Sequence, residues 1–180
     1  YMDMRYRLRH KNGEYVWIRD RGFFVPDSTG KAERQLGMME DITAAKKAEE
    51  ALKASEEKYR LIFETALEGI FQTTPDGRYL SVNPAFARMF GFSSPQEMVT
   101  TVTDIGRQLY VRPEDRERMK AILAERGHVE KFEAQIRRRD GTVLWILINA
   151  KAVRGPKGDI LYYEGTNVDI TERKLAQESL

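Results

Sequence analysis

The sequence contains an internal repeat, which constrains the fold more than any other feature. A shift that carries Trp17 onto Trp145 also carries Gly37 onto Gly165, and no gap is needed. The same shift aligns Asp41-Ile42-Thr43 with Asp169-Ile170-Thr171. Chance rarely aligns a tryptophan, turn glycines and a tripeptide together, so we interpret the two stretches as copies of one structural unit. Far more chain precedes the second copy than the first, which predicts that the chain begins inside a domain.

The position of the repeat predicts four segments. Residues 1–43 are expected to be the C-terminal part of a truncated upstream domain, and residues 44–62 a helical connector. Residues 63–169 would form one complete domain, and residues 170–180 the start of a second connector, the output signalling helix. A strand triplet without its partners exposes apolar faces, so we expect it to pair with another chain or with an upstream segment. These faces carry Tyr6, Leu8, Val16 and Ile18.

Composition excludes several classes of protein. The 180 residues include 30 Lys and Arg against 28 Asp and Glu, and a charge so nearly balanced gives no indication of nucleic-acid binding. The absence of cysteine excludes disulfides, thiolate metal sites and thiol nucleophiles. Apolar runs are far shorter than the roughly 20 residues that span a bilayer, so no membrane contact is expected. We expect a cytoplasmic location, although this composition is also compatible with the periplasm.

Hydrophobic periodicity predicts the architecture of the complete domain. Alternation around residues 132–136, a turn at Asp140-Gly141, and β-rich runs over 143–153 and 160–168 predict three antiparallel strands. Before them, a hairpin turns at residues 75–77. One helix starts at Asn83-Pro84, and a longer one starts at Pro113 and ends at Gly127. The predicted fold class is α+β, with a five-stranded antiparallel sheet and flanking helices.

The connector has a different character. Residues 44–65 contain no Gly or Pro, and small or apolar residues recur at heptad spacing, as in a coiled coil. This seam consists of Ala48, Leu52, Ser55, Tyr59, Ile62 and Ala66. We expect a homodimer through the helical connectors. The alternative is a solitary solvated helix stabilised by Glu and Lys pairs.

Motifs in the complete domain resemble the PAS domain with its C-terminal PAC motif, found in bacterial sensor histidine kinases and cyclic-di-GMP signalling proteins. The residues that carry the resemblance are Asp76-Gly77-Arg78-Tyr79-Leu80-Ser81-Val82-Asn83-Pro84-Ala85-Phe86, Phe90-Gly91-Phe92-Ser93, Pro113-Glu114-Asp115-Arg116, Arg139-Asp140-Gly141, Trp145 and Asp169-Ile170-Thr171. The resemblance implies a PAS fold, preceded by a partial PAS strand triplet and the helical connector. It also implies a sensory module whose pocket is coupled, through the helix after the last strand, to an output domain. That domain would be a histidine kinase, a diguanylate cyclase or a transcription activator.

The resemblance and the spacing of apolar residues together suggest two sets of site residues. The candidate ligand pocket consists of Phe71, Phe86, Met89, Phe90, Met98, Ile105, Leu109, Met119, Phe132, Ala134, Ile136, Ile146, Ile148 and Tyr163. These residues could equally form an ordinary core without a cavity. The candidate signal-coupling residues are Asp41, Ile42, Thr43, Trp145, Asp169, Ile170 and Thr171. Trp145 is expected to face away from the pocket, against a connector helix or a second subunit.

The resemblance also narrows the cofactors. The flavin photosensor branch of the family needs a reactive cysteine, which this chain lacks. The oxygen-sensing haem branch has its axial histidine near the start of the long helix, where this chain has Arg116 or a neighbour. Covalent flavin and haem are therefore not expected, whereas non-covalent flavin stays open. The expected occupant is a small organic ligand or none.

We find no indication of catalysis or of a metal site in the sequence. His10 and His128 are the only histidines, and neither has a phosphoacceptor or zinc-binding context. We expect His128 at the surface, at the end of the helix that precedes it. Residues 155–158 are expected to join two strands and not to bind phosphate. The sequence therefore predicts a sensor of a small ligand that relays its state, or, as the alternative, a ligand-free PAS module that only dimerises and relays.

Overall fold

The computed structural model describes residues 1–178, apart from the side chains of Ala32 and Glu178. Residues 179 and 180, the last two of the predicted second connector, lie outside the described residues. The chain separates into two compact units, Tyr1–Tyr59 and a second that starts at Arg60. The segment boundaries predicted at 43, 62 and 169 stay predictions. No helix within residues 1–178 is long and apolar enough to cross a membrane.

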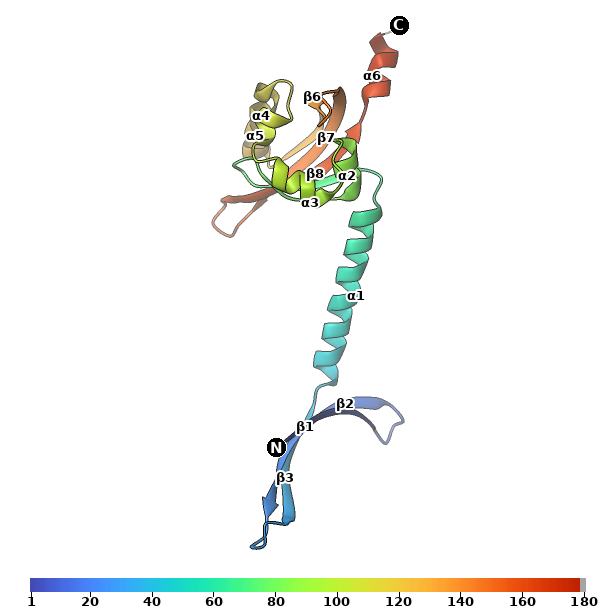
Figure 1. Ribbon diagram of the computed structural model, residues 1–180, viewed down its shortest axis with the longest axis vertical. Coiled ribbons are helices and arrows are strands. Elements are labelled where there is room, and N and C mark those ends of the chain that lie inside the picture. The colour runs from blue at the N-terminus through green and yellow to red at the C-terminus, as the bar shows by residue number, and fades with distance from the viewer. Residues whose placement is uncertain (179–180) are drawn as a thin grey trace. The chain divides into compact units, whose positions relative to one another are not determined.

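The N-terminal unit is a three-stranded antiparallel sheet followed by a helix (Figure 1). Its elements are β1 (Met2–Arg9), β2 (Tyr15–Pro26), β3 (Ala32–Asp41) and α1 (Thr43–Thr65). Of the apolar residues expected at its surface, Leu8 is exposed, and Tyr6 and Val16 are half-buried. The expectation was wrong for Ile18, whose exposed fraction is only 9%. This residue lies on the central strand β2, between β1 and β3, where neighbouring side chains cover it.

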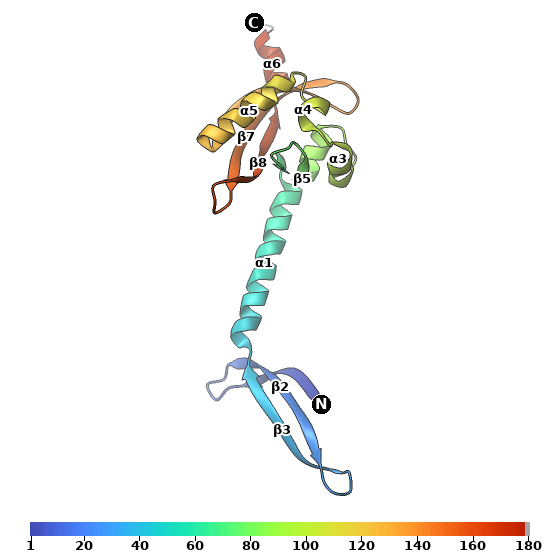
Figure 2. The same ribbon diagram turned by 90° about the vertical axis from the view of Figure 1, so that its left-hand side faces the viewer.

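The second unit contains the larger sheet, with strand order β5-β4-β8-β7-β6 and every pairing antiparallel. Figures 1 and 2 show the short helices and the longer α5 gathered on one side of this sheet. The core lies between the helices and the sheet. The elements are β4 (Gly69–Thr73), β5 (Tyr79–Val82), α2 (Pro84–Met89), α3 (Pro95–Thr101), α4 (Ile105–Gln108), α5 (Pro113–Arg126), β6 (His128–Arg137), β7 (Val143–Arg154), β8 (Ile160–Asp169) and α6 (Thr171–Glu178).

The sequence repeat is also a repeat of strand register. Ile18 pairs with Asp41 in the first sheet, and Ile146 pairs with Asp169 in the second. Both pairings also shift register at corresponding positions, between Val25 and Pro26 and between Val153 and Arg154. The β2-β3 pairing therefore reproduces the β7-β8 pairing, as the alignment predicted, whereas β6 has a register shift between Val129 and Phe132 that β1 lacks.

Asn83 is the fully buried cap of α2 and also holds the start of β4. Its Oδ1 accepts hydrogen bonds from the backbone N–H groups of Phe86 and Ile70, each at 2.9 Å. Its Nδ2 donates to the carbonyl oxygen of Glu68 at 2.9 Å. One side chain thus satisfies three backbone groups that burial would otherwise leave unpaired. This fixes α2 against the first strand of the sheet.

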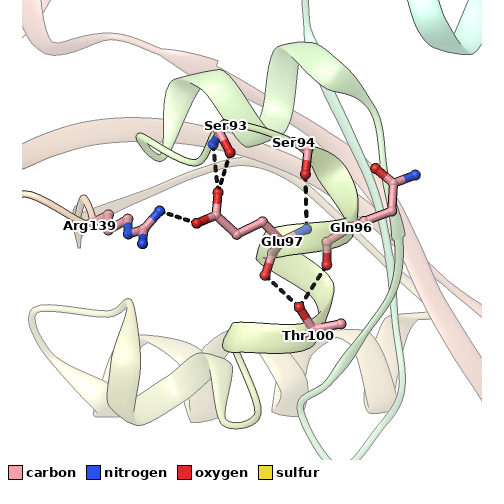
Figure 3. A network of polar contacts seen from close by, with 6 residues as sticks. All are labelled: Ser93, Ser94, Gln96, Glu97, Thr100 and Arg139. Atoms are coloured by element: carbon pink, nitrogen blue, oxygen red, sulfur yellow. Dashed lines mark hydrogen bonds and ion pairs between the residues drawn. The ribbon is translucent and has the colours of Figure 1, made fainter.

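A polar network caps α3 and ties it to the turn between β6 and β7 (Figure 3). Ser94 Oγ accepts a hydrogen bond from the backbone N–H of Glu97 at 3.1 Å, while the Glu97 carboxylate accepts from the Ser93 N–H at 2.9 Å. This arrangement is similar to a capping box, except that the carboxylate accepts from Ser93, the residue before the N-cap Ser94. The Ser93 hydroxyl and the Arg139 guanidinium also bind the carboxylate. These contacts, those from Ser93 above all, hold the pKa of Glu97 below its ordinary value.

Replacing Glu97 with Gln should reduce stability at neutral pH and have progressively less effect in acid. Because the folded pKa of Glu97 lies below its unfolded value, the carboxylate's contribution is fully present above the unfolded pKa, about 4.3 for a glutamate. That contribution is lost as the pH falls through the folded pKa. Urea unfolding of wild type and E97Q between pH 7 and pH 3 measures the difference. The exposed Glu125→Gln on α5 is the control, and a wild type–E97Q gap independent of pH would contradict this account.

Gly165 allows β7 and β8 to approach closely. A Cβ atom built on this residue would lie 2.1 Å from the carbonyl oxygen of Asn149 and 2.8 Å from the Cα of Ala150. Both neighbours are backbone atoms of the adjacent strand and cannot move alone. Gly37 occupies the matching place in the first sheet, where an added Cβ would lie 2.8 Å from the carbonyl oxygen of Arg21.

Gly165→Ala should therefore destabilise the second unit by about 1–3 kcal/mol or more, the usual range for overpacking. The measurement is chemical unfolding in a Trp17→Phe background, where the near-ultraviolet tryptophan signal comes from Trp145 alone. Gly158→Asn is the matched control, because nothing lies within 4 Å of its added Cβ and asparagine tolerates a positive φ. Equal destabilisation by the two substitutions would show that the strand contact at Gly165 is not responsible.

Candidate functional site

The core of the second unit encloses a cavity of about 20 Å³ between the sheet and the helices. A space of this size holds one or two water molecules. Its lining residues come from both layers, so the cavity lies where a shift in any helix or strand would change its shape. They are Phe71, Thr73, Tyr79, Phe86, Phe90, Ile105, Leu109, Tyr110, Arg116, Met119, Ile136, Ile146, Ile148 and Asn167.

Most of the predicted pocket residues are in the core, and a subset of them lines the cavity. Those that line it are Phe71, Phe86, Phe90, Ile105, Leu109, Met119, Ile136, Ile146 and Ile148. Met98, Phe132, Ala134 and Tyr163 are buried elsewhere in the core. Met89 is only partly buried and packs against the outside of the core. The assignment of a ligand to these residues stays a prediction.

The polar part of the lining was missed, because the search considered only apolar residues. It consists of Thr73, Tyr79, Tyr110, Arg116 and Asn167. A signal existed for Arg116, which precedes Met119 by three positions and Leu123 by seven and therefore shares their helix face. All three are buried. From the sequence, Arg116 was assigned to a family motif and to the place of a haem ligand, but not to the pocket.

Arg116 is a buried cation without a carboxylate partner. Its exposed fraction is 3%, and among the described residues it forms no ion pair. Its Nη2 donates a long hydrogen bond of 3.4 Å to Thr73 Oγ1, and its Cζ lies 6.0 Å from the centre of the Tyr163 ring. Its Nε is buried and has no hydrogen-bond partner. Burying a charge in this way is costly unless something compensates it.

The neighbouring carboxylate does not compensate this charge. Asp115 is also buried, with an exposed fraction of 5%, but it pairs with two exposed arginines. The distances are 3.1 Å to Arg112 Nε and 3.1 Å to Arg118 Nη2. The local charges therefore pair toward the surface, and the guanidinium of Arg116 is left on the cavity side.

The other polar groups of the lining are neutral. Burial raises the pKa of Tyr79 and Tyr110, and for Tyr110 the nearby Arg116 charge and a hydrogen bond to it oppose the increase. Both phenols therefore keep their protons at physiological pH. Asn167 contributes a buried Oδ1 that has no hydrogen-bond partner. The cavity thus combines one positive charge with at least one unpaired acceptor.

A second candidate feature is the junction between β8 and α6. The backbone N–H of Ile170 donates to the carbonyl oxygen of Trp145 at 2.9 Å, and the N–H of Trp145 donates to Thr171 Oγ1 at 2.9 Å. Asp169 Oδ1 accepts from the N–H and the hydroxyl of Thr171, at 2.9 and 2.6 Å. We call these four hydrogen bonds the junction clasp. It fixes the first residue of α6 to the backbone of β7.

The first unit contains the same arrangement between β2 and α1. Ile42 N–H donates to the carbonyl oxygen of Trp17 at 2.8 Å, and Trp17 N–H donates to Thr43 Oγ1 at 2.8 Å. Asp41 Oδ1 accepts from Thr43 N–H at 2.9 Å, and the hydroxyl of Thr43 is the main cause that lowers the pKa of Asp41. The predicted coupling residues therefore meet at both strand-to-helix junctions. Whether they transmit a signal stays a prediction.

Trp145 lies half-buried against α6. The Nζ of Lys174 is 5.1 Å from the centre of its ring, a cation–π distance. Glu133 on β6 pairs with Arg173 at 2.8 Å and with Lys174. Trp145 therefore contacts the helix after the last strand, on the opposite face of β7 from the cavity residue Ile146.

Thr171→Val should loosen the start of α6, because it removes the acceptor for the Trp145 N–H. The matched control is Thr142→Val, since Thr142 binds Asp140 Oδ1 through its N–H and hydroxyl as Thr171 binds Asp169, but without the cross-strand bond. Loss of a partly buried hydrogen bond costs about 1 kcal/mol, which corresponds to roughly fivefold to tenfold faster amide exchange. Hydrogen exchange of the Trp145 amide tests this. Equal exchange rates in the two variants would show that the clasp does not hold the junction.

The described residues contain no cluster of candidate metal ligands. No group of three or more His, Asp or Glu side chains within residues 1–178 is placed to hold a metal ion. His10 is exposed. His128 is exposed as expected, but it begins β6 and does not belong to the end of α5.

Comparisons with known proteins agree with this geometry. A family model for the PAS fold matches residues 57–170, and a second PAS-fold model matches residues 1–39. The two-component sensor PprA of Pseudomonas aeruginosa is 26% identical over 98% of this chain, and the sensor histidine kinase TmoS of Ectopseudomonas mendocina is 28% identical over 72%. The chain spans only 19% and 13% of these proteins.

A solved structure shows the same fold. A domain of a sensory box sensor histidine kinase/response regulator from Geobacter sulfurreducens is 26% identical to this chain, with a TM-score of 0.51. The match covers 66% of this chain and 96% of that domain. The similarity thus includes both units of this chain but only a small part of the longer relatives.

Proposed function

The chain belongs to the PAS family, and on that premise we propose that it senses a small ligand in the core of its second unit and relays occupancy to an output domain. The observation that carries the proposal is the position of Trp145 between the cavity and α6. Its neighbour Ile146 lines the cavity, and its own N–H and carbonyl groups both belong to the junction clasp.

This position supports a short physical route from ligand to helix. A ligand that displaces the Ile146 side chain strains the β7 backbone, because close-packed interiors transmit small displacements. The backbone N–H and carbonyl groups of the neighbouring residue, Trp145, bind Thr171 and Ile170. The strain therefore reaches the first turn of α6 within one residue of Ile146. The clasp is the element with two arrangements, closed and open, that such a relay requires.

The exposed seam of α1 supports the second half of the proposal, homodimerisation through the helical connectors. None of the residues of α1 is buried, and Leu52 and Ile62 have exposed fractions of 62% and 57%. A helix of this length with a narrow apolar stripe gains stability by pairing with a second copy.

A ligand-free relay is the second candidate, and one observation favours it. The cavity of about 20 Å³ is nearly filled by side chains, so the core is close to complete without an occupant. In that case the module would dimerise and transmit changes that arise elsewhere in the parent protein. The output domain of either version would be a histidine kinase, as in the named relatives, or a diguanylate cyclase, and the chain would work in the cytoplasm, where kinases find ATP.

Native mass spectrometry of the purified chain distinguishes the two versions. We expect a species of twice the 20.9 kDa chain mass that carries additional non-covalent mass. A dimer at bare protein mass would favour the ligand-free relay. A bare monomer at micromolar concentration would contradict both the ligand and the coiled coil.

A pair of variants tests the interface itself. Leu52→Glu places a charge in the seam and should weaken dimerisation by about tenfold or more, because burying an unpaired carboxylate is costly. Lys53→Glu adds the same side chain one position away, outside the seam, and should leave the dimer intact. If both variants dissociate equally, the dimer does not form through this stripe.

A further inference from the structure

We infer that the cavity of the second unit binds a small organic carboxylate, held by the guanidinium of Arg116. This inference rests on the proposed function, because it names the ligand class of the same cavity. It begins from an imbalance in the lining: a buried cation faces the cavity, and no described carboxylate is paired with it.

The free edge of the guanidinium matches a carboxylate. Arginine binds carboxylates side-on through Nε and one Nη, with two parallel hydrogen bonds. In Arg116 the Nε is unpartnered and the Nη2 makes only the 3.4 Å contact with Thr73. The donors that would form a two-point contact are therefore free or weakly used. A neutral ligand would leave the charge of Arg116 uncompensated.

The backbone and neighbours keep this side chain in place. Gly106 of α4 lies against its stem, where a Cβ would come 3.7 Å from Arg116 Cγ. The Tyr163 ring and the Tyr110 hydroxyl flank the guanidinium and give partial compensation. These contacts orient the cation without supplying a negative charge, as expected of a preorganised binding group.

Asn167 and the size of the cavity limit the possible ligands further. The unpaired Asn167 Oδ1 needs a donor, which a hydroxyl group on the ligand would supply. A space of about 20 Å³ holds one or two water molecules, so a carboxylate enters only if side chains move, and the smallest carboxylates need the least movement. Formate, acetate and glycolate are the smallest candidates, and glycolate alone of the three also carries the hydroxyl group that Asn167 would bind.

The test follows the Nε–H resonance of Arg116 by nuclear magnetic resonance in the ¹⁵N-labelled full chain. Formate, acetate, glycolate, chloride, acetamide and ethanol are each titrated in a buffer without other small anions. We expect a saturable shift with the carboxylates, strongest with glycolate. Acetamide, the neutral counterpart of acetate, should bind at least about tenfold more weakly, because a hydrogen bond between charged groups is replaced by a neutral one.

Variants supply the matched comparison. The variants lack the Arg116 Nε–H, so their titrations follow the backbone amide resonances of the cavity residues Ile146 and Asn167, as does a parallel wild-type titration. Arg116→Gln should weaken acetate binding by about tenfold or more, whereas Arg126→Gln, which removes the same charge from an exposed position on α5, should change it less than twofold. If R116Q does not fold, Arg116→Lys replaces it, because lysine keeps the positive charge but lacks the planar guanidinium. The wild-type titration still tests whether carboxylates bind more tightly than neutral probes. Acetate binding unchanged in R116Q or R116K would overturn the inference.

The remaining outcomes separate this inference from the proposed function. Shifts with ethanol or acetamide but not with carboxylates would show that the cavity binds a neutral ligand. The assignment of a carboxylate would then be wrong, but the proposal of ligand sensing would be retained. Chloride that binds as tightly as acetate would show an unselective anion site and overturn the carboxylate. If none of the six probes shifts the resonance of any cavity residue, the assignment of a carboxylate is wrong. If native mass spectrometry also shows the protein without additional mass, the proposal of ligand sensing is wrong as well.

Discussion

The pair of backbone hydrogen bonds at Trp145 connects the parts of the second unit that the proposed function needs. Its N–H and carbonyl groups bind Thr171 and Ile170, so the end of β8 and the start of α6 are positioned from β7. Strand β7 is paired on both sides and therefore cannot shift alone. In the proposed relay, a helix attached to such a strand would move with the sheet. The same bonds at Trp17 show that the chain uses this solution at both junctions.

Much of the fold could be predicted from the sequence, because its signals are local. Alternating strands, Asn83-Pro84 at a helix start, Gly127 at a helix end and the glycine-free connector each act through backbone conformation or a single cap. The repeat added long-range information, since copies of one sequence adopt the same register. Burial of Ile18 was not predicted, because it depends on strand neighbours that periodicity alone does not place.

The candidate site was only half predictable, and the missing half has a common cause. Apolar cavity residues follow from periodicity, but Thr73, Tyr110, Arg116 and Asn167 face the same space without an apolar signature. A charged residue on an otherwise apolar helix face breaks the hydrophobic pattern, and it is therefore easily assigned to the surface. Arg116 is such a residue, and it supplies the positive charge that lines the cavity. Asn167, which also lines the cavity, lies on a strand whose alternation gives no sign of an unpaired oxygen.

The buried charge of Arg116 and the junction clasp suggest a physical link between ligand binding and the start of α6. In the proposed mechanism, the uncompensated charge of Arg116 destabilises the packed core when no anion is bound, because a charge is stabilised by access to water. Ile146 has an exposed fraction of only 1%, so an anion that pairs with Arg116 has to displace this side chain. A ligand shifts an equilibrium only by its differential affinity for the two states, and a charge that it alone neutralises provides such a difference. The displacement of Ile146 would then reach Trp145 and the clasp as a change in β7, with no further site required.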